Sequence, residues 1–167
     1  FRYILVPANG AATDEGVFHA ALAVARLAAA HLAFLHVRVD MRHTLLGMAG
    51  DDLAGGGYGG LVDSVQRDVE ARQRRAQDAV TMFCARAQVA LADGKPVCGP
   101  SAAWVVEAGD EAQCLITYGR IADLTVLGRG RDTHQAAQHL LEHVLLGTGR
   151  PLLIAPEHGG NSIGRRI

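Results

Sequence analysis

The segment YILVPANG, residues 3–10, decides how the chain is expected to fold. Its first five residues form a continuous, mostly apolar run that ends in turn-forming residues, which is typical of a short strand buried on both faces. Thr13 then offers a capping hydroxyl, residues 14 and 15 are acidic, and apolar residues recur on one helical face from 17 to 28. The chain is therefore predicted to begin with a strand, a turn and a helix.

The same alternation of strand and helix continues to the C-terminal end. Strands separated by helices need crossover connections, which place helices on both faces of a parallel sheet. The sequence thus predicts a doubly wound, open α/β domain with five strands and four helices. After the first strand and helix, we expect strands at 32–39, 102–106, 123–127 and 152–155, and helices at roughly 61–91, 110–120 and after a glycine-basic turn at 128–131.

The length of 167 residues fits one domain, which would bury about 68–70% of the surface of its unfolded chain. We assign residues 1–157 to this domain and 158–167 to a C-terminal tail. Residues 41–60 contain seven glycines and no periodic pattern, so we expect a flexible insertion there.

Composition argues against several classes of partner and location. The 16 basic and 17 acidic residues are not grouped into blocks, so we expect binding neither to nucleic acid nor to an anionic membrane surface. Cys84, Cys98 and Cys114 fit neither a disulfide framework nor a C-x-x-C pair and are interpreted as buried thiols. No apolar run approaches the ~18 residues of a membrane span, and the first ten residues do not resemble a signal peptide. We expect a cytoplasmic protein.

Four segments, in their order and spacing, resemble the universal stress protein family: YILVPANG at 3–10, LHV at 35–37, EAGDEAQCLITYGRIADLTVLGRG at 107–130 and GRPLLIAP at 149–156. The resemblance implies an adenine nucleotide alpha hydrolase-like fold with strand order 3-2-1-4-5. It also implies a homodimer, often formed by pairing of the last strands. Here that strand is 152–155, an apolar sheet edge whose unpaired backbone groups favour such pairing.

The resemblance also implies where a nucleotide would bind. Nucleotide-binding members carry Asp after the first strand and, after the fourth, G-x-x-G, nine residues, then Gly with Ser or Thr; such glycines let backbone N–H groups approach phosphate. Here Asn9 stands where Asp is usual, and Gln138 and His139 replace the final Gly and hydroxyl residue. Gly128 lies ten residues before Gln138, about three fewer than in that pattern. This shortening resembles the branch typified by universal stress protein A, whose members generally do not bind ATP.

Two functional interpretations follow from the resemblance. The leading one is a non-enzymatic, dimeric stress-response protein with a degenerate nucleotide site, without a cofactor, that acts through an unknown protein partner. The second is an ATP or adenine-nucleotide binder, with slow hydrolysis as an option. In the second interpretation the site would comprise Ala8, Asn9 and Val37 around base and ribose, Gly128, Arg129, Gly130 and Arg131 at the phosphates, and Gln138 and His139 at the start of the last helix.

For the glycine-basic turn at 128–131 and for His36 we favour a structural role over a functional one. Gly128 and Gly130 would simply turn the chain, with Arg129 and Arg131 solvated. His36 lies in the second strand, where a hydrogen-bonded buried imidazole is expected rather than a catalytic group.

A third interpretation rests on His139, Glu142 and His143, which spell H-x-x-E-H. Two histidines one turn apart can hold zinc while the glutamate acts as base in a zinc hydrolase. No later segment offers a convincing third ligand, so we assign no catalytic or metal-binding residue. We expect the histidines on the exposed side of the last helix, where the pair could bind nickel or zinc incidentally.

Overall fold

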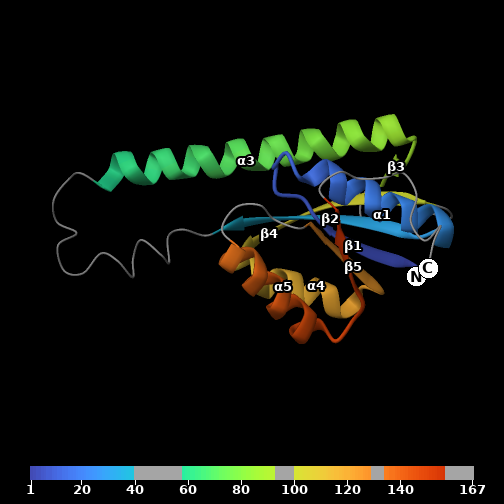
Figure 1. The fold of residues 1–167 in the computed structure, drawn as a ribbon. Coiled ribbons are helices and arrows are strands. Elements are labelled where there is room, and N and C mark those ends of the chain that lie inside the picture. The colour runs from blue at the N-terminus through green and yellow to red at the C-terminus, as the bar shows by residue number, and fades with distance from the viewer. Residues whose placement is uncertain (40–57, 93–99, 129–133, 157–167) are drawn as a thin grey trace.

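The computed structural model of the chain describes residues 1–39, 58–92, 100–128 and 134–156 (Figure 1). The predicted insertion lies mostly outside these residues, and the predicted tail lies entirely outside them. The elements, in chain order, are β1 (Tyr3–Pro7), α1 (Asp14–Ala28), β2 (His31–Val39), α3 (Tyr58–Ala87), β3 (Ala90–Leu91), β4 (Ser101–Gly109), α4 (Glu111–Ile121), β5 (Leu124–Gly128), α5 (His134–Thr148) and β6 (Leu152–Ala155).

The strands form one parallel sheet in the order β3-β4-β2-β1-β5-β6. Its five longer strands have the predicted order 3-2-1-4-5, which confirms the doubly wound α/β class. The predicted count of five was wrong, because β3 adds a sixth strand that pairs Ala90 and Leu91 with the start of β4. A two-residue strand is too short to show any period in the sequence.

Two elements differ in extent from the prediction. Helix α3 ends at Ala87 rather than near residue 91, because Gln88 adopts a left-handed backbone with φ 56° and the N–H of Val89 closes back onto the carbonyl of Cys84 at 3.0 Å. Strand β4 spans nine residues instead of five, because it pairs with β2 along its whole length. By contrast, β6 has the predicted bounds.

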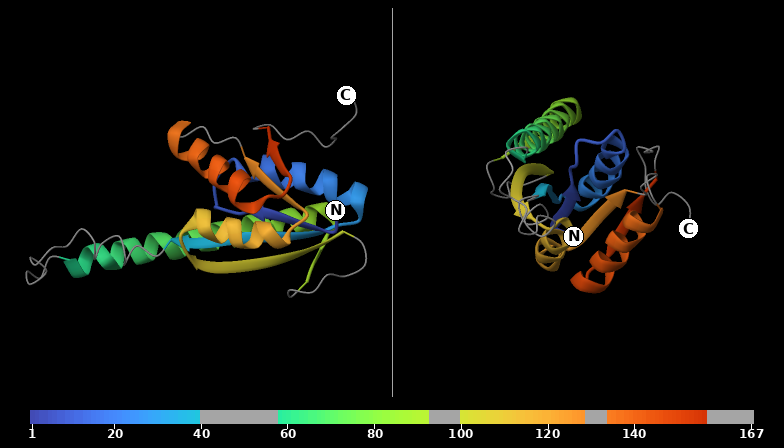
Figure 2. Two further views of the ribbon diagram at one scale, coloured as in Figure 1. Left: turned by 90° about the horizontal axis from the view of Figure 1, so that it is seen from below. Right: turned by 90° about the vertical axis from the view of Figure 1, so that its left-hand side faces the viewer.

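The helices form a layer on each face of the sheet, with α1 and α3 on one side and α4 and α5 on the other (Figure 2). Alternate residues of β1 face the two layers: Ile4 and Val6 belong to the core under α1 and α3, and Leu5 to the core under α4 and α5. The first core contains three packed phenylalanines, Phe18, Phe34 and Phe83, with ring centroids 4.9–6.2 Å apart.

None of the described helices combines the length and the apolar character needed to span a lipid bilayer. Helix α3 is long enough at 30 residues, but charged side chains interrupt its sequence throughout. In Figure 1 its N-terminal part extends beyond the carboxyl ends of the strands.

Candidate functional site

The carboxyl ends of β1 and β5 border a cavity of about 590 Å³. Helix α1 follows β1 on one face of the sheet and α5 follows β5 on the other, so the chain diverges at this point, as expected for a ligand crevice in an open α/β sheet. The described residues that line the cavity are Pro7, Asn9, Thr13, Asp14, Val17, Asp110, Glu111, Ala112, Leu127, Gly128, His139, Leu140, Leu141 and His143.

A single buried carboxylate organises the loop after β1. Oδ2 of Asp14 accepts hydrogen bonds from the backbone N–H groups of Asn9 (2.9 Å), Gly10 (2.8 Å) and Ala11 (3.3 Å). The predicted role of Thr13 was wrong, because its side chain makes no capping hydrogen bond to α1. Burial raises the pKa of Asp14, partly offset by these N–H donors.

Gly10 lies where the same loop meets α3. Its φ is +71°, and a Cβ at this position would come within 2.9 Å of the carbonyl oxygen of Arg72. A residue with a side chain would therefore be both strained and obstructed there. The loop is held by Asp14 on one side and by the backbone of α3 on the other.

His36, in β2, hydrogen-bonds the start of this loop. Its Nδ1–H donates to the carbonyl oxygen of Ala8 at 2.7 Å, and its ring stacks on Trp104 with centroids 5.7 Å apart. His36 is 1% exposed, so the predicted buried, hydrogen-bonded imidazole is confirmed. Ala8 and Val37, which the nucleotide-binding interpretation places around base and ribose, are 0% and 7% exposed and belong to the core.

Two more carboxylates, at the start of α4, line the same cavity. Asp110 caps this helix, with Oδ1 accepting from the N–H of Gln113 at 2.8 Å. Glu111 Oε1 accepts from the side-chain amide of Asn9 at 3.2 Å, so Asn9 connects the loop after β1 to α4. With Asp14, three carboxylates line the cavity, and no Lys or Arg does so within the described ranges.

Gly128, at the end of β5, is accounted for by packing. A Cβ on this residue would lie 2.8 Å from Cγ2 of Val17, a buried residue of α1. A glycine is thus needed to let β5 and α1 approach, whether or not a phosphate binds there. Arg129, Gly130 and Arg131 lie outside the described residues, as does the side chain of Gln138.

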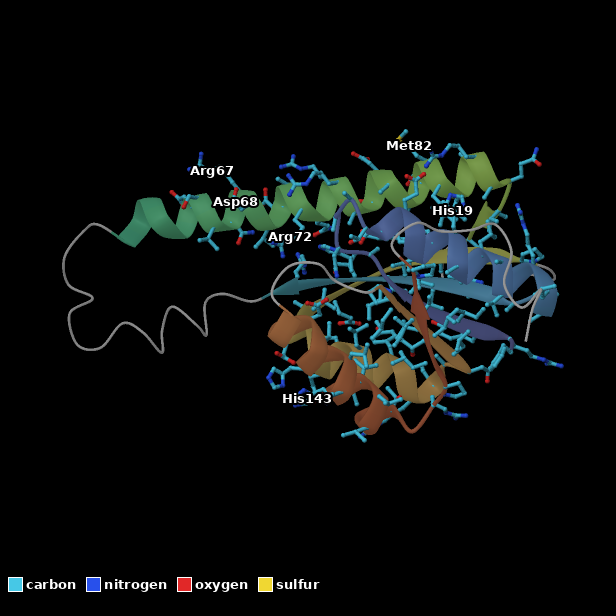
Figure 3. The ribbon with its side chains drawn as sticks, in the orientation of Figure 1. His19, Arg67, Asp68, Arg72, Met82 and His143 are labelled. Carbon is cyan, nitrogen blue, oxygen red and sulfur yellow. The ribbon has the colours of Figure 1, made fainter. Side chains whose placement is uncertain are left out.

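His139 and His143 lie on α5 at the cavity and have exposed side chains. Figure 3 shows His143 projecting from α5. Its Nδ1–H donates to the carbonyl oxygen of His139 at 2.7 Å. Among the described residues, no three His, Cys, Asp or Glu side chains are arranged to hold a metal ion, so a catalytic zinc site with three protein ligands is not formed by that part of the chain.

Solved structures with this architecture are numerous. A universal stress protein UspA from Lactobacillus plantarum matches with a TM-score of 0.65 at 17% identity, covering 93% of this chain and 97% of that one. The chain has the fold of the universal stress proteins. A universal stress protein from Archaeoglobus fulgidus shares this fold with a TM-score of 0.55 at 15% identity, covering 93% of both chains. A universal stress protein solved in complex with cAMP matches with a TM-score of 0.50 at 15% identity, covering 95% and 98%.

No family model and no curated protein matches the sequence. In the universal stress fold, the cavity of this chain lies at the switch between β1 and β5, where the resemblance placed it. Asn9, Gly128 and His139 are among the residues that line it. The sequence interpretation did not place Asp14, Asp110 or Glu111 in the site, although Asp110 and Glu111 directly follow β4 and Asp14 begins the helix after β1.

Proposed function

We propose that this chain is a universal stress protein domain that acts without catalytic turnover, as a dimeric stress-response regulator with a degenerate nucleotide site. The three carboxylates among the described lining residues carry this proposal. Asp14, Asp110 and Glu111 would repel the phosphates of a nucleotide at the carboxyl ends of β1 and β5. Asp14 also engages the three backbone N–H groups that the loop after β1 would otherwise offer to an anion.

The glycine that most resembles a phosphate-binding residue supports the same proposal. A Cβ on Gly128 would lie only 2.8 Å from Cγ2 of Val17, so packing alone explains why this residue is a glycine. The spacing from Gly128 to Gln138 is also shorter than in the nucleotide-binding pattern, so little of that pattern remains in this chain.

An ATP titration by calorimetry, with magnesium, tests the proposal. We expect no saturable heat in the micromolar range. A variant with Asp14→Asn and Glu111→Gln removes two charges while keeping hydrogen-bonding groups of similar size. If charge is the cause, this variant should bind ATP more tightly than the unmodified chain. A micromolar isotherm with the unmodified chain would overturn the proposal.

A second candidate, binding of an adenine nucleotide, is favoured by the size of the cavity. About 590 Å³ lies within the usual range of small-molecule sites, about 300–1,000 Å³, so volume does not exclude such a ligand. The complex of a similarly folded protein with cAMP makes a nucleotide with one phosphate the sharper probe, because its single charge is repelled less than a triphosphate. Titration with cAMP as well as ATP tests this candidate, and saturable binding of either nucleotide would favour it over the first proposal.

We further propose that β6 pairs with its copy in the dimer. This strand lies at the edge of the sheet and pairs only with β5 among the described strands. The side chain of Ile154 in this strand is exposed, with 48% of its surface accessible. An exposed apolar edge is prone to pair with another strand. Light scattering after size exclusion should give a dimer, and Ile154→Lys should give a monomer. Leu27→Lys, at a 79% exposed position on α1, is the matched control and should remain dimeric.

A further inference from the structure

The histidine pair of α5 has an arrangement that the proposed function does not use. His139 and His143 are four residues apart, so their side chains leave the same face of the helix with Cβ atoms about 5–6 Å apart. Both are exposed and both line the cavity at the carboxyl ends of the strands. Two imidazoles at this spacing can reach one ion.

The hydrogen bond within the pair prepares His143 as a ligand. A carbonyl oxygen only accepts, so Nδ1 of His143 carries the proton that it donates to His139 at 2.7 Å. In the neutral ring, Nε2 then holds the free lone pair. Metal-bound histidines are commonly oriented in this way, by a hydrogen bond from the other ring nitrogen to a carbonyl oxygen.

The carboxylates among the described lining residues favour a cation beside this pair. Asp14, Asp110 and Glu111 line the same cavity, and carboxylates raise the local concentration of cations. No complete cluster of three ligands exists among the described residues, so water would fill the other positions around an ion. Imidazole ligands select Cu²⁺, Ni²⁺ and Zn²⁺ over Mg²⁺ and Ca²⁺, which prefer oxygen.

We propose that His139 and His143 form a two-imidazole binding site for a divalent transition-metal ion at the rim of this cavity. The site binds the ion reversibly and leaves coordination positions open. It uses no residue of the loop after β1, although His139 also belongs to the candidate nucleotide site in the same cavity.

Calorimetric titration of the untagged full chain with Zn²⁺ tests the proposal. We expect saturable binding of one ion per chain. His139→Ala and His143→Ala should each weaken the affinity at least tenfold. His19→Ala removes a part-exposed histidine from α1 and is the matched control; its affinity should equal that of the unmodified chain. Far-ultraviolet circular dichroism of each variant verifies that α5 is retained, which is expected because both side chains are exposed.

Titration with Mg²⁺ separates the histidine pair from the acidic cavity wall. We expect at least tenfold weaker binding of Mg²⁺ than of Zn²⁺. Equal affinities for the two ions would assign the binding to the carboxylates and overturn the proposal. So would the absence of saturable Zn²⁺ binding, or Zn²⁺ affinities unchanged in both His139→Ala and His143→Ala.

Discussion

The phenol of Tyr118 donates a hydrogen bond to the carboxylate of Glu107 and so joins α4 to β4. The two residues border a second, smaller cavity of about 300 Å³ together with Cys114. A carboxylate that accepts from a phenol stabilises the protonated phenol. This bond and burial raise the pKa of Tyr118 to about 12.

Titration of tyrosinate absorbance tests this bond. The difference between the unmodified chain and Tyr118→Phe should isolate a phenol that ionises near pH 12, and Glu107→Gln should move it toward 10.0. Because the folded-state pKa is raised, the stabilisation is complete below the unfolded value near 10 and is lost as pH rises through about 12. Ionisation near 10 in the unmodified chain would contradict the hydrogen bond.

Replacement of Asp14 should affect stability through the loop after β1. Asp14→Ala leaves three N–H groups without their acceptor and should lower the free energy of unfolding by about 1–3 kcal/mol. Asp14→Asn keeps a side-chain oxygen and should stay within about 1 kcal/mol of the unmodified chain. Urea denaturation measures both, and equal losses in the two variants would contradict this account.

The pH dependence of this residue follows from the direction of its shift. Burial raises the folded-state pKa of Asp14 above its ordinary value of 3.8, so the folded chain favours the protonated carboxyl group more than the unfolded chain does. Its contribution becomes more favourable as pH falls through the folded-state pKa. Carbon NMR of the carboxyl group should show titration above 3.8.

Packing between Gly128 and Val17 predicts a coupled pair of substitutions. Gly128→Ala should lower the free energy of unfolding by about 1–3 kcal/mol, because its methyl group would lie 2.8 Å from a short, stiff side chain in the core. In a Val17→Ala background the same substitution should cost at least about 0.5 kcal/mol less. Strictly additive losses would show that the two residues do not obstruct each other.

The hydroxyl of Thr125 is the one buried side-chain polar atom that lacks a hydrogen-bond partner within the described part of the chain. Thr125→Val replaces it with a methyl group of similar size and should raise the free energy of unfolding by about 1 kcal/mol, or leave it unchanged. Ser101→Ala is the contrasting variant: it removes the 2.8 Å hydrogen bond to His31 and should destabilise by about 1 kcal/mol. Thermal and urea unfolding compare the two; a clear loss in Thr125→Val would indicate that the hydroxyl is satisfied.

The sequence by itself determined the order of the elements other than β3, because the signals for them are local. An apolar run such as Leu152–Ala155 and a helix with 3.6-residue periodicity are visible without knowing what they pack against. Asp110 marks the start of α4 for the same reason, since a cap bonds an N–H only three residues away. The crossover rule then converts this order into a doubly wound sheet.

Only the tertiary structure decided what lines the cavity. Ala8 follows β1 and Val37 lies near the end of β2, and the neighbouring strands and helices bury both in the core. Asp14, Asp110 and Glu111 come from two distant parts of the chain and form one acidic wall because β1 and β4 end at the same edge of the sheet. Gly128 resembles a phosphate-binding glycine in the sequence, and its contact with Val17 exists only once β5 and α1 are packed. Periodicity reports what a residue does within its own element, whereas burial and charge at a site depend on elements that the chain brings together from far apart.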